Sequence, residues 1–127
     1  ALDFSFGVRI DRLSTGNRKK LFIAFSLASN PALLLMDEPF ASLDFLTREE
    51  LQTQLLGIQQ KMPRTIILVT HQLDEAVLLG QKIIVMHSDS TVREFDLSGE
   101  LYPRDLSAPQ MQQLKREITD ECRKAQA

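Results

Sequence analysis

Two short apolar runs set the strongest limit on how this chain can fold. They are "LLLM" at residues 33–36 and "TIILV" at residues 65–69, and threonine is the single polar residue in either. An uninterrupted apolar run of this length is typical of a strand that is covered on both faces of a parallel sheet. The stretch between the runs can hold a crossover helix. We therefore expect two parallel neighbouring strands in an α/β fold.

Helical patterns precede the first run and separate it from the second. We expect one helix over residues 17–29, and another that starts at a Thr47–Glu50 capping box and ends at Pro63. The side chains expected to face the core from these helices are Leu21, Ala24, Phe25, Leu27, Ala28, Leu51, Leu55, Ile58 and Met62.

The remaining chain predicts a helix, a hairpin and a last helix. Residues 72–80 form the expected short helix, closed by Gly80, and residues 88–90 form the hairpin turn. Ser107 and Gln110 are the expected caps of the last helix. Its expected inward side chains are Met111, Leu114, Ile118 and Cys122.

Composition narrows the class of protein. The 127 residues suffice for one domain, and the net charge of −2 with no basic stripe argues against nucleic-acid binding. The single cysteine, Cys122, excludes an internal disulfide bond, and no apolar run approaches the roughly 20 residues that cross a bilayer. Because the chain opens on Ala1 rather than methionine, we expect a processed protein or a piece of something longer, and the composition as a whole indicates a cytosolic protein.

Two adjacent acids, Asp37 and Glu38, follow the first apolar run. They can be a solvated strand end. Alternatively, one carboxylate holds Mg²⁺ while the other orients or deprotonates an attacking water, as phosphoryl transfer requires. Ligands of open parallel sheets bind beyond the carboxyl ends of the strands, where His71 ends the second run. A lone histidine is more often structural, but at this position His71 could reach the same ligand.

"LSTGNRKK" at residues 13–20 places a serine and a glycine directly before a helix. The segment can be a plain helix N-cap. It can also be an anion site, because a hydroxyl, backbone N–H groups and the positive helix end together favour phosphate. Three basic residues, Arg18, Lys19 and Lys20, lie in this first turn. Their positive charges interact unfavourably with the helix dipole but would attract an anion.

Taken in order, "LSTGN", "LLLMDEP", "ASLD" and "TH" resemble the second half of the ATPase subunit of ABC transporters. They match the signature motif, the Walker B strand with its catalytic glutamate, the D-loop and the switch histidine. The segments "FLTREELQ", "DEAVLL" and "SAPQMQQLKREI" look most like importer ATPases of the nitrate, sulfonate and taurine type. Residues 1–127 are thus expected to be the C-terminal part of an ABC-type nucleotide-binding domain.

The resemblance implies roles for eight residues. Asp37 would bind Mg²⁺, Glu38 would be the general base, and His71 would sense the γ-phosphate of ATP. The residues implied to contact ATP on a second subunit, or to couple the two sites, are Ser14, Gly16, Asn17, Ser42 and Asp44. Transmembrane permease subunits would be further partners, with the protein at the inner face of the cell membrane.

The chain departs from the family in what it lacks. No G-x-x-x-x-G-K-[ST] motif occurs among Gly7, Gly16, Gly57, Gly80 and Gly99. We therefore expect a partial P-loop NTPase-like three-layer fold with a mostly parallel sheet, lacking the N-terminal P-loop half. Without strands from that half, one apolar sheet face would be bare, and the chain alone should be inactive. Thr15, Asn17 and Phe25 also differ from the usual signature region.

Two functions from different classes follow. One is an ATP-binding and hydrolysing subunit that powers solute uptake, completed by its missing half. The other is a non-catalytic interaction module that pairs with a complete ATPase subunit. A third alternative is an unrelated small α/β domain whose motifs agree by accident.

Overall fold

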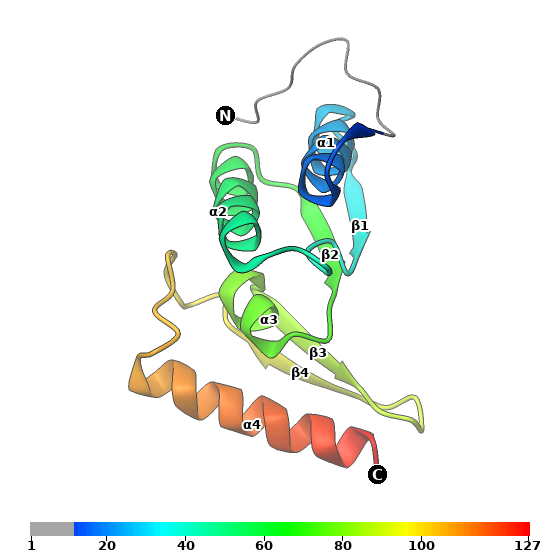
Figure 1. The fold of residues 1–127 in the computed structure, drawn as a ribbon. Helices are drawn as coiled ribbons and strands as arrows, with labels where there is room; N and C mark the ends of the chain where they lie inside the picture. The colour runs from blue at the N-terminus through cyan, green and yellow to red at the C-terminus, as the bar shows by residue number, and fades with distance from the viewer. Residues whose placement is uncertain (1–11) are drawn as a thin grey trace. The chain divides into compact units, whose positions relative to one another are not determined.

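A computed structural model describes residues 12–127, and the chain divides into two compact units, Ala1–Val69 and Thr70–Ala127 (Figure 1). The described part of the first unit contains α1 (Thr15–Ala28), β1 (Leu33–Asp37), α2 (Phe45–Lys61) and β2 (Thr65–Val69). The second unit contains α3 (Leu73–Leu79), β3 (Lys82–Met86), β4 (Val92–Asp96) and α4 (Pro109–Ala125). The predicted order of elements is confirmed, and each helix or strand lies within a few residues of its expected place.

The strands β1 and β2 pair in parallel, as the two apolar runs predict. Their register places Leu35 opposite Ile67 and Asp37 opposite Val69. The N–H of Glu38 donates to the carbonyl oxygen of Val69 at 2.8 Å, so pairing continues one residue beyond β1. The carboxyl ends of the two strands therefore lie together.

The two faces of this small sheet differ in exposure. Met36 is 7% exposed, whereas its neighbour Leu35 on the opposite face is 65% exposed. The apolar side chains exposed on the same face as Leu35 are Leu33, Ile67 and Val69. The expectation that both sheet faces are covered is therefore wrong for residues 12–127. The bare face expected for a sheet without further strands is present.

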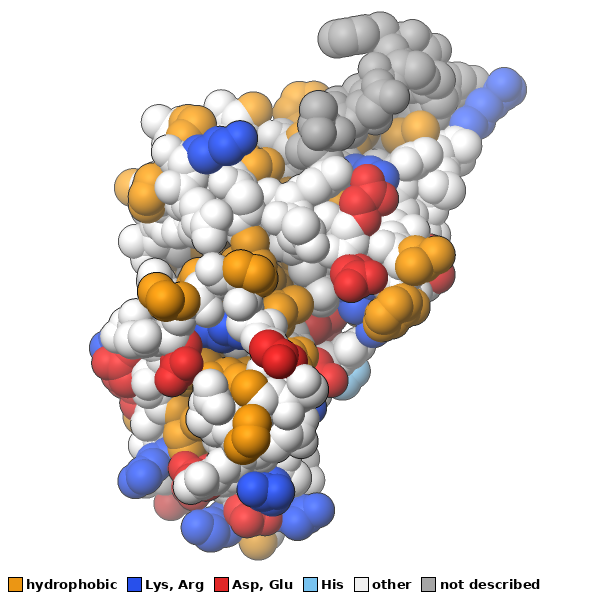
Figure 2. All heavy atoms as spheres, turned by 90° about the vertical axis from the view of Figure 1, so that its left-hand side faces the viewer, with side chains coloured by type: hydrophobic (Ala, Val, Ile, Leu, Met, Phe, Trp, Pro, Cys, Tyr) orange, Lys and Arg blue, Asp and Glu red, His pale blue; other side chains and the backbone are white. Residues whose placement is uncertain are grey.

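Buried side chains from four segments of the first unit make its core: Ile23, Leu27, Met36, Phe40, Leu43, Leu51 and Leu55. Phe25, Ala28 and Met62 were expected to face inward, and all three are exposed. Ile23 and Leu27, four residues apart, define the buried face of α1 instead, and Met62 lies beyond the last turn of α2. Hydrophobic side chains also reach the surface on the face drawn in Figure 2.

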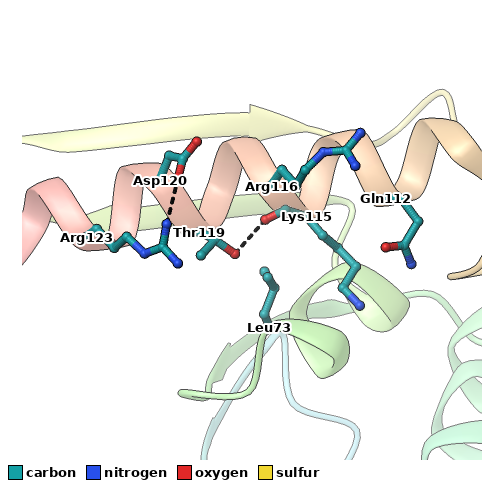
Figure 3. A pocket seen from close by; sticks show the side chains of 7 residues that line it. All are labelled: Leu73, Gln112, Lys115, Arg116, Thr119, Asp120 and Arg123. Atoms are coloured by element: carbon teal, nitrogen blue, oxygen red, sulfur yellow. Dashed lines mark hydrogen bonds and ion pairs between the residues drawn. The ribbon is translucent and has the colours of Figure 1, made fainter.

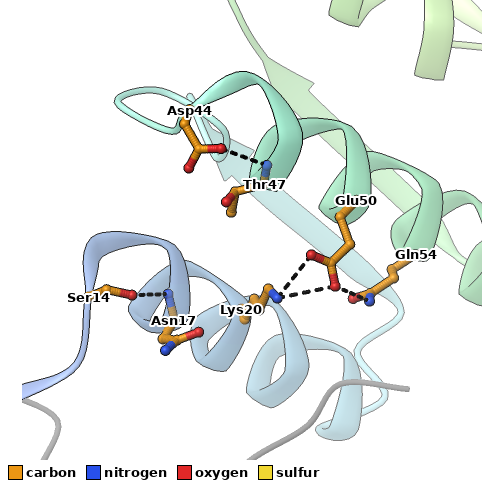
Figure 4. Close-up of polar contacts among 7 residues, drawn as sticks. All are labelled: Ser14, Asn17, Lys20, Asp44, Thr47, Glu50 and Gln54. Carbon is orange, nitrogen blue, oxygen red and sulfur yellow. Dashed lines mark hydrogen bonds and ion pairs between the residues drawn. The ribbon is translucent and has the colours of Figure 1, made fainter.

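The predicted Thr47–Glu50 capping box is wrong, because α2 begins three residues earlier. Asp44 is the N-cap, and its carboxylate accepts from the Thr47 N–H at 3.0 Å. This N–H and then the Thr47 hydroxyl lower the pKa of Asp44. Glu50 instead binds Lys20 of α1 at 3.2 Å and accepts from Gln54 at 3.1 Å (Figure 4).

The second unit packs α3 and α4 on the expected β3–β4 hairpin. Its core is apolar and consists of Val77, Ile83, Val85, Leu97, Met111, Ile118 and Ala125. The predicted inward side chains Leu114 and Cys122 pack against this core. The predicted Ser107 and Gln110 caps are wrong, since Ala108 is the N-cap and the Ser107 hydroxyl donates to Asp105 at 2.6 Å.

Arg104 anchors the loop between β4 and α4. Its guanidinium is buried and donates to the carbonyl oxygens of Val77 at 2.8 Å, Leu97 at 3.1 Å, and Gly80. A Cβ atom at Gly80 would lie 2.8 Å from the Ala76 carbonyl oxygen, so glycine is required at this close approach. Among residues 12–127, no helix combines the length and apolar character that crossing a membrane would need.

The two faces of β1 make a matched pair of substitutions. We expect Met36→Thr to lower the free energy of unfolding by about 2 kcal/mol, because it buries a hydroxyl and removes packed atoms. Leu35→Thr should change that free energy by less than about 0.5 kcal/mol, because Leu35 is largely exposed. Urea unfolding measures both values, and equal losses would contradict the assigned faces.

The Asp44 cap predicts a pH-dependent contribution to stability. Since the pKa of Asp44 is lower in the folded chain than in the unfolded chain, its contribution is complete above the unfolded value. It disappears as the pH falls through the folded value. Asp44→Asn retains an N-cap acceptor without a titrating group, so it should match the parent's thermal midpoint at neutral pH and lose less on acidification. If the thermal midpoints of the parent and of Asp44→Asn fell by the same amount on acidification, the assigned role of the Asp44 carboxylate would be contradicted.

Candidate functional site

The candidate site starts where β1 ends. Asp37 is the last residue of the strand and is exposed, and Glu38 turns away from it with a φ of 46°. The Ala41 N–H closes a turn by donating to the Glu38 carbonyl oxygen at 3.2 Å. Phe40, inside this turn, is completely buried. The two carboxylates therefore lie where β1 enters a short loop that is anchored in the core.

Lys19 links α1 to this loop. Its ammonium donates to the carbonyl oxygen of Glu38 at 3.3 Å and also to that of Ala41. The first turns of α1 and the end of β1 therefore belong to one hydrogen-bonded arrangement within the first unit. Lys19 appears in the sequence as one of three basic residues in a row, and no sequence signal distinguishes it from the other two.

The start of α1 is an ordinary capped helix N-terminus. The Ser14 side chain accepts from the Asn17 N–H at 3.2 Å, which confirms the N-cap (Figure 4). The first turn contains no acidic residue. The capping serine does not exclude an anion, because further N–H groups of the first turn point out of the helix end.

Gly16 brings the starts of α1 and α2 close together. A Cβ atom at Gly16 would lie 3.0 Å from Cγ2 of Thr47 and 3.9 Å from Cδ2 of Leu43. Any larger residue at position 16 would press on the start of α2. The signature-like segment and the D-loop-like segment are therefore neighbours.

The D-loop-like segment contains a second backbone constraint. Ser42 has a φ of 63°, in the left-handed region that serine rarely occupies. Asp44, two residues later, uses its carboxylate to cap α2. Positive φ values at Glu38 and at Ser42 thus bracket the turn, and the fold must stabilise both.

His71 belongs to the second unit and is exposed. Its neighbour Thr70 donates to the Glu75 carboxylate at 2.7 Å and accepts from the Gln72 N–H at 3.0 Å. These contacts fix the entry into α3. The convergence of His71 with Asp37 and Glu38 stays a prediction.

The donor set can be compared with the needs of Mg²⁺. Among the described residues, no three of the side chains of His, Cys, Asp or Glu cluster as metal ligands would. Mg²⁺ at a nucleotide site usually takes one or two carboxylates together with phosphate oxygens and water. The exposed Asp37 carboxylate at the strand end fits that pattern.

A groove between α3 and α4 is the main competing feature of the second unit (Figure 3). Its volume is about 360 Å³, and Leu73 and one face of α4 line it. Two of its three basic residues pair with acids, Lys115 with Asp74 at 2.6 Å and Arg123 with Asp120 at 3.2 Å. This pairing makes the groove a weaker candidate than the end of β1.

His87, directly after β3, has a partner on α4. Its Nε2 lies 3.0 Å from the Glu121 carboxylate, which joins the hairpin to α4. Nothing in the local sequence pattern signals a contact between residues this far apart. Both side chains are half-buried, so the pair contributes to the stability of the second unit.

Comparison with known proteins identifies relatives of the chain. A family model described as "AAA domain, putative AbiEii toxin, Type IV TA system" matches residues 2–77. The ATP-binding protein GbuA of Listeria monocytogenes, named for glycine betaine/carnitine transport, is 48% identical over 82 residues. The aliphatic sulfonates import ATP-binding protein SsuB 1 of Paracoccus denitrificans is 42% identical over 106 residues.

The chain spans only part of these relatives. The GbuA match covers 65% of this chain and 21% of GbuA, and the SsuB 1 match covers 84% and 43%. The taurine import ATP-binding protein TauB of Rhizobium johnstonii is 45% identical over 87 residues, covering 67% of this chain and 33% of its own length.

Solved structures agree with the sequence relatives. The dimeric bacterial ABC transporter cassette MJ0796 is similar with a TM-score of 0.61 and 31% identity, covering 70% of this chain and 38% of that one. The same cassette bound to ADP and Pi gives a TM-score of 0.59 at 34% identity, covering 68% and 37%. The predicted α/β fold of the P-loop NTPase type is thereby confirmed. The chain therefore belongs to the AAA domain family, and its relatives in sequence and in structure are ATP-binding cassettes of ABC transporters.

Proposed function

We propose that this chain supplies the hydrolytic part of an ATPase that powers solute import through an ABC transporter. Residues 1–127 would correspond to the C-terminal part of the nucleotide-binding domain. The observation that carries the proposal is the joining of the α1 start, the Asp37–Glu38 loop and the Ser42–Asp44 segment in one unit. Support also comes from relatives named as import ATP-binding proteins.

In the proposed reaction Asp37, Glu38 and His71 act on the terminal phosphate of ATP. Asp37 would hold Mg²⁺, which neutralises phosphate charge when bound. Glu38 would accept the proton of a water that attacks the γ-phosphorus, while the bond to ADP breaks. His71 follows Val69 by two residues, so covalent geometry keeps its backbone within about 7 Å of that strand end. From there it would donate a hydrogen bond to the γ-phosphate.

The start of α1 would face nucleotide held by a second ATPase subunit. Ser14 would offer its hydroxyl, Gly16 its backbone N–H and Asn17 its side-chain amide at a positive helix end, since the Asn17 N–H already donates to Ser14. Ser42 and Asp44, beside this helix end through the Gly16 packing, would communicate between the two sites. The relative MJ0796 has a dimeric structure, which supports an arrangement of two subunits.

The proposal requires another polypeptide segment to grip ATP. No G-x-x-x-x-G-K-[ST] motif exists in the 127 residues, and this motif cradles the β- and γ-phosphates. The bare face of β1 and β2 would receive part of that segment. Permease subunits would hold the assembly at the inner face of the membrane.

A second candidate function is a non-catalytic module that binds a complete ATPase subunit. It is favoured by the same two observations, the absent motif and the exposed apolar face around Leu35. In that case the chain would offer Ser14 and Gly16 to nucleotide without hydrolysing it.

The test uses a reconstituted assembly, which we define as this chain mixed with a polypeptide that carries the P-loop half of an importer ATPase. We expect no ATP turnover by the chain alone and Mg²⁺-dependent turnover by the assembly. Glu38→Gln should lower that turnover about 100-fold or more, because the general base is lost. Phosphate release measures both rates.

Glu49→Gln is the matched control, since Glu49 is exposed on α2. It should leave turnover unchanged. Turnover by the chain alone that Glu38→Gln removes would contradict the need for a second segment. Binding to a complete subunit, with turnover that Glu38→Gln does not alter, would favour the module.

A further inference from the structure

We infer that Lys19 is a positioning residue, which holds the backbone of the Glu38 loop in register with the start of α1. The inference rests on the proposed function, since it concerns the placement of the proposed general base. Neither the signature-like motif nor the strand-end acids include Lys19. The inference comes from its two contacts in the structure.

Both contacts of Lys19 are hydrogen bonds from a charged donor. The part-buried ammonium of Lys19 donates to two carbonyl oxygens, those of Glu38 and Ala41. Hydrogen bonds from a charged donor are stronger than those between neutral groups. Both acceptors belong to the backbone. Lys19 therefore fixes the backbone path of the loop independently of the side-chain conformations in it.

The loop that follows β1 has a strained backbone, which other contacts must stabilise. Glu38 and Ser42 both have positive φ values, which cost free energy for residues other than glycine. The turn between them is closed by one backbone hydrogen bond, from Ala41 to Glu38, at 3.2 Å. Lys19 donates to the carbonyl oxygens of these same two residues, Glu38 and Ala41. Lys19 therefore braces the turn at both of its ends.

Lys19 is also close in sequence to the start of α1. Lys19 is five residues after Ser14, and α1 is continuous between them. A helix moves as a rigid element over so short a length. A displacement of the α1 start, where the proposed second nucleotide contacts the chain, would therefore pull on the Glu38 carbonyl. Through Lys19, contact of nucleotide with the α1 start is coupled to the position of the proposed general base, Glu38.

The next residue, Lys20, is a built-in control. It carries the same charge as Lys19 and lies in the same helix. Its ammonium, however, binds the exposed Glu50 carboxylate of α2 at 3.2 Å (Figure 4). Lys20 therefore stabilises the packing of α1 on α2 without touching the loop. Lys19→Met and Lys20→Met each remove one charge and keep most of the stem.

The first experiment measures amide hydrogen exchange in the chain itself. Lys19→Met should speed exchange of the Ala41 N–H about tenfold or more, because the turn loses two hydrogen bonds from a charged donor and opens more often. The Arg48 N–H, which donates to Asp44 in α2, should be unaffected. Lys20→Met should leave Ala41 unchanged, and Lys19→Arg should restore most of its protection. Equal effects of Lys19→Met and Lys20→Met on Ala41 would overturn the inference.

The second experiment measures steady-state kinetics in the reconstituted assembly. Lys19→Met should lower kcat about tenfold or more with KM for ATP nearly unchanged, since Lys19 touches the loop rather than nucleotide. Lys20→Met should leave both parameters near the parent values. An unchanged kcat in Lys19→Met would overturn the role in hydrolysis. Absence of turnover in the unsubstituted assembly would reject the proposed function, whereas hydrogen exchange would still decide whether Lys19 holds the loop.

Discussion

The parallel pairing of β1 with β2 is the constraint on which the first unit depends. The register extends one residue past β1, where the Glu38 N–H reaches the Val69 carbonyl oxygen. That bond determines where the chain must leave the sheet, and the turn through Phe40 follows from it. Asp37 and Glu38 consequently lie at the carboxyl end of the sheet and not along its edge. The Lys19 contacts then tie this end to the start of α1.

Much of this arrangement could be predicted from the sequence, because the signals are local. Uninterrupted apolar runs predict β1 and β2, and the interval between them predicts the crossover helix and hence parallel pairing. Ser14 before a helical pattern predicts the α1 cap. The order of the four motifs indicates the family, and the absent P-loop motif predicts the exposed apolar face that Leu35 now shows.

The errors in helix caps and helix faces share one physical origin, which is competition between contacts that the sequence does not rank. Thr47 and Glu50 satisfy the capping-box pattern, but Asp44 is a stronger cap and Glu50 finds Lys20 on the neighbouring helix. Phe25 fits a helical stripe, yet the face of α1 that packs is the one with Ile23 and Leu27. Lys19 was not distinguished from its neighbours because its acceptors are backbone oxygens some 20 positions away. Backbone acceptors leave no mark in the sequence.

The central claim is that the loop after β1 faces a metal-bound nucleotide phosphate. Paramagnetic broadening tests it most directly, with Mn²⁺ in place of Mg²⁺ and a non-hydrolysable ATP analogue in the reconstituted assembly. The account predicts strong broadening of the amide signals of residues 37–42 and little at residues 57–61, in the last turns of α2. Broadening that spares residues 37–42, or that is equally strong at the end of α2, would contradict it.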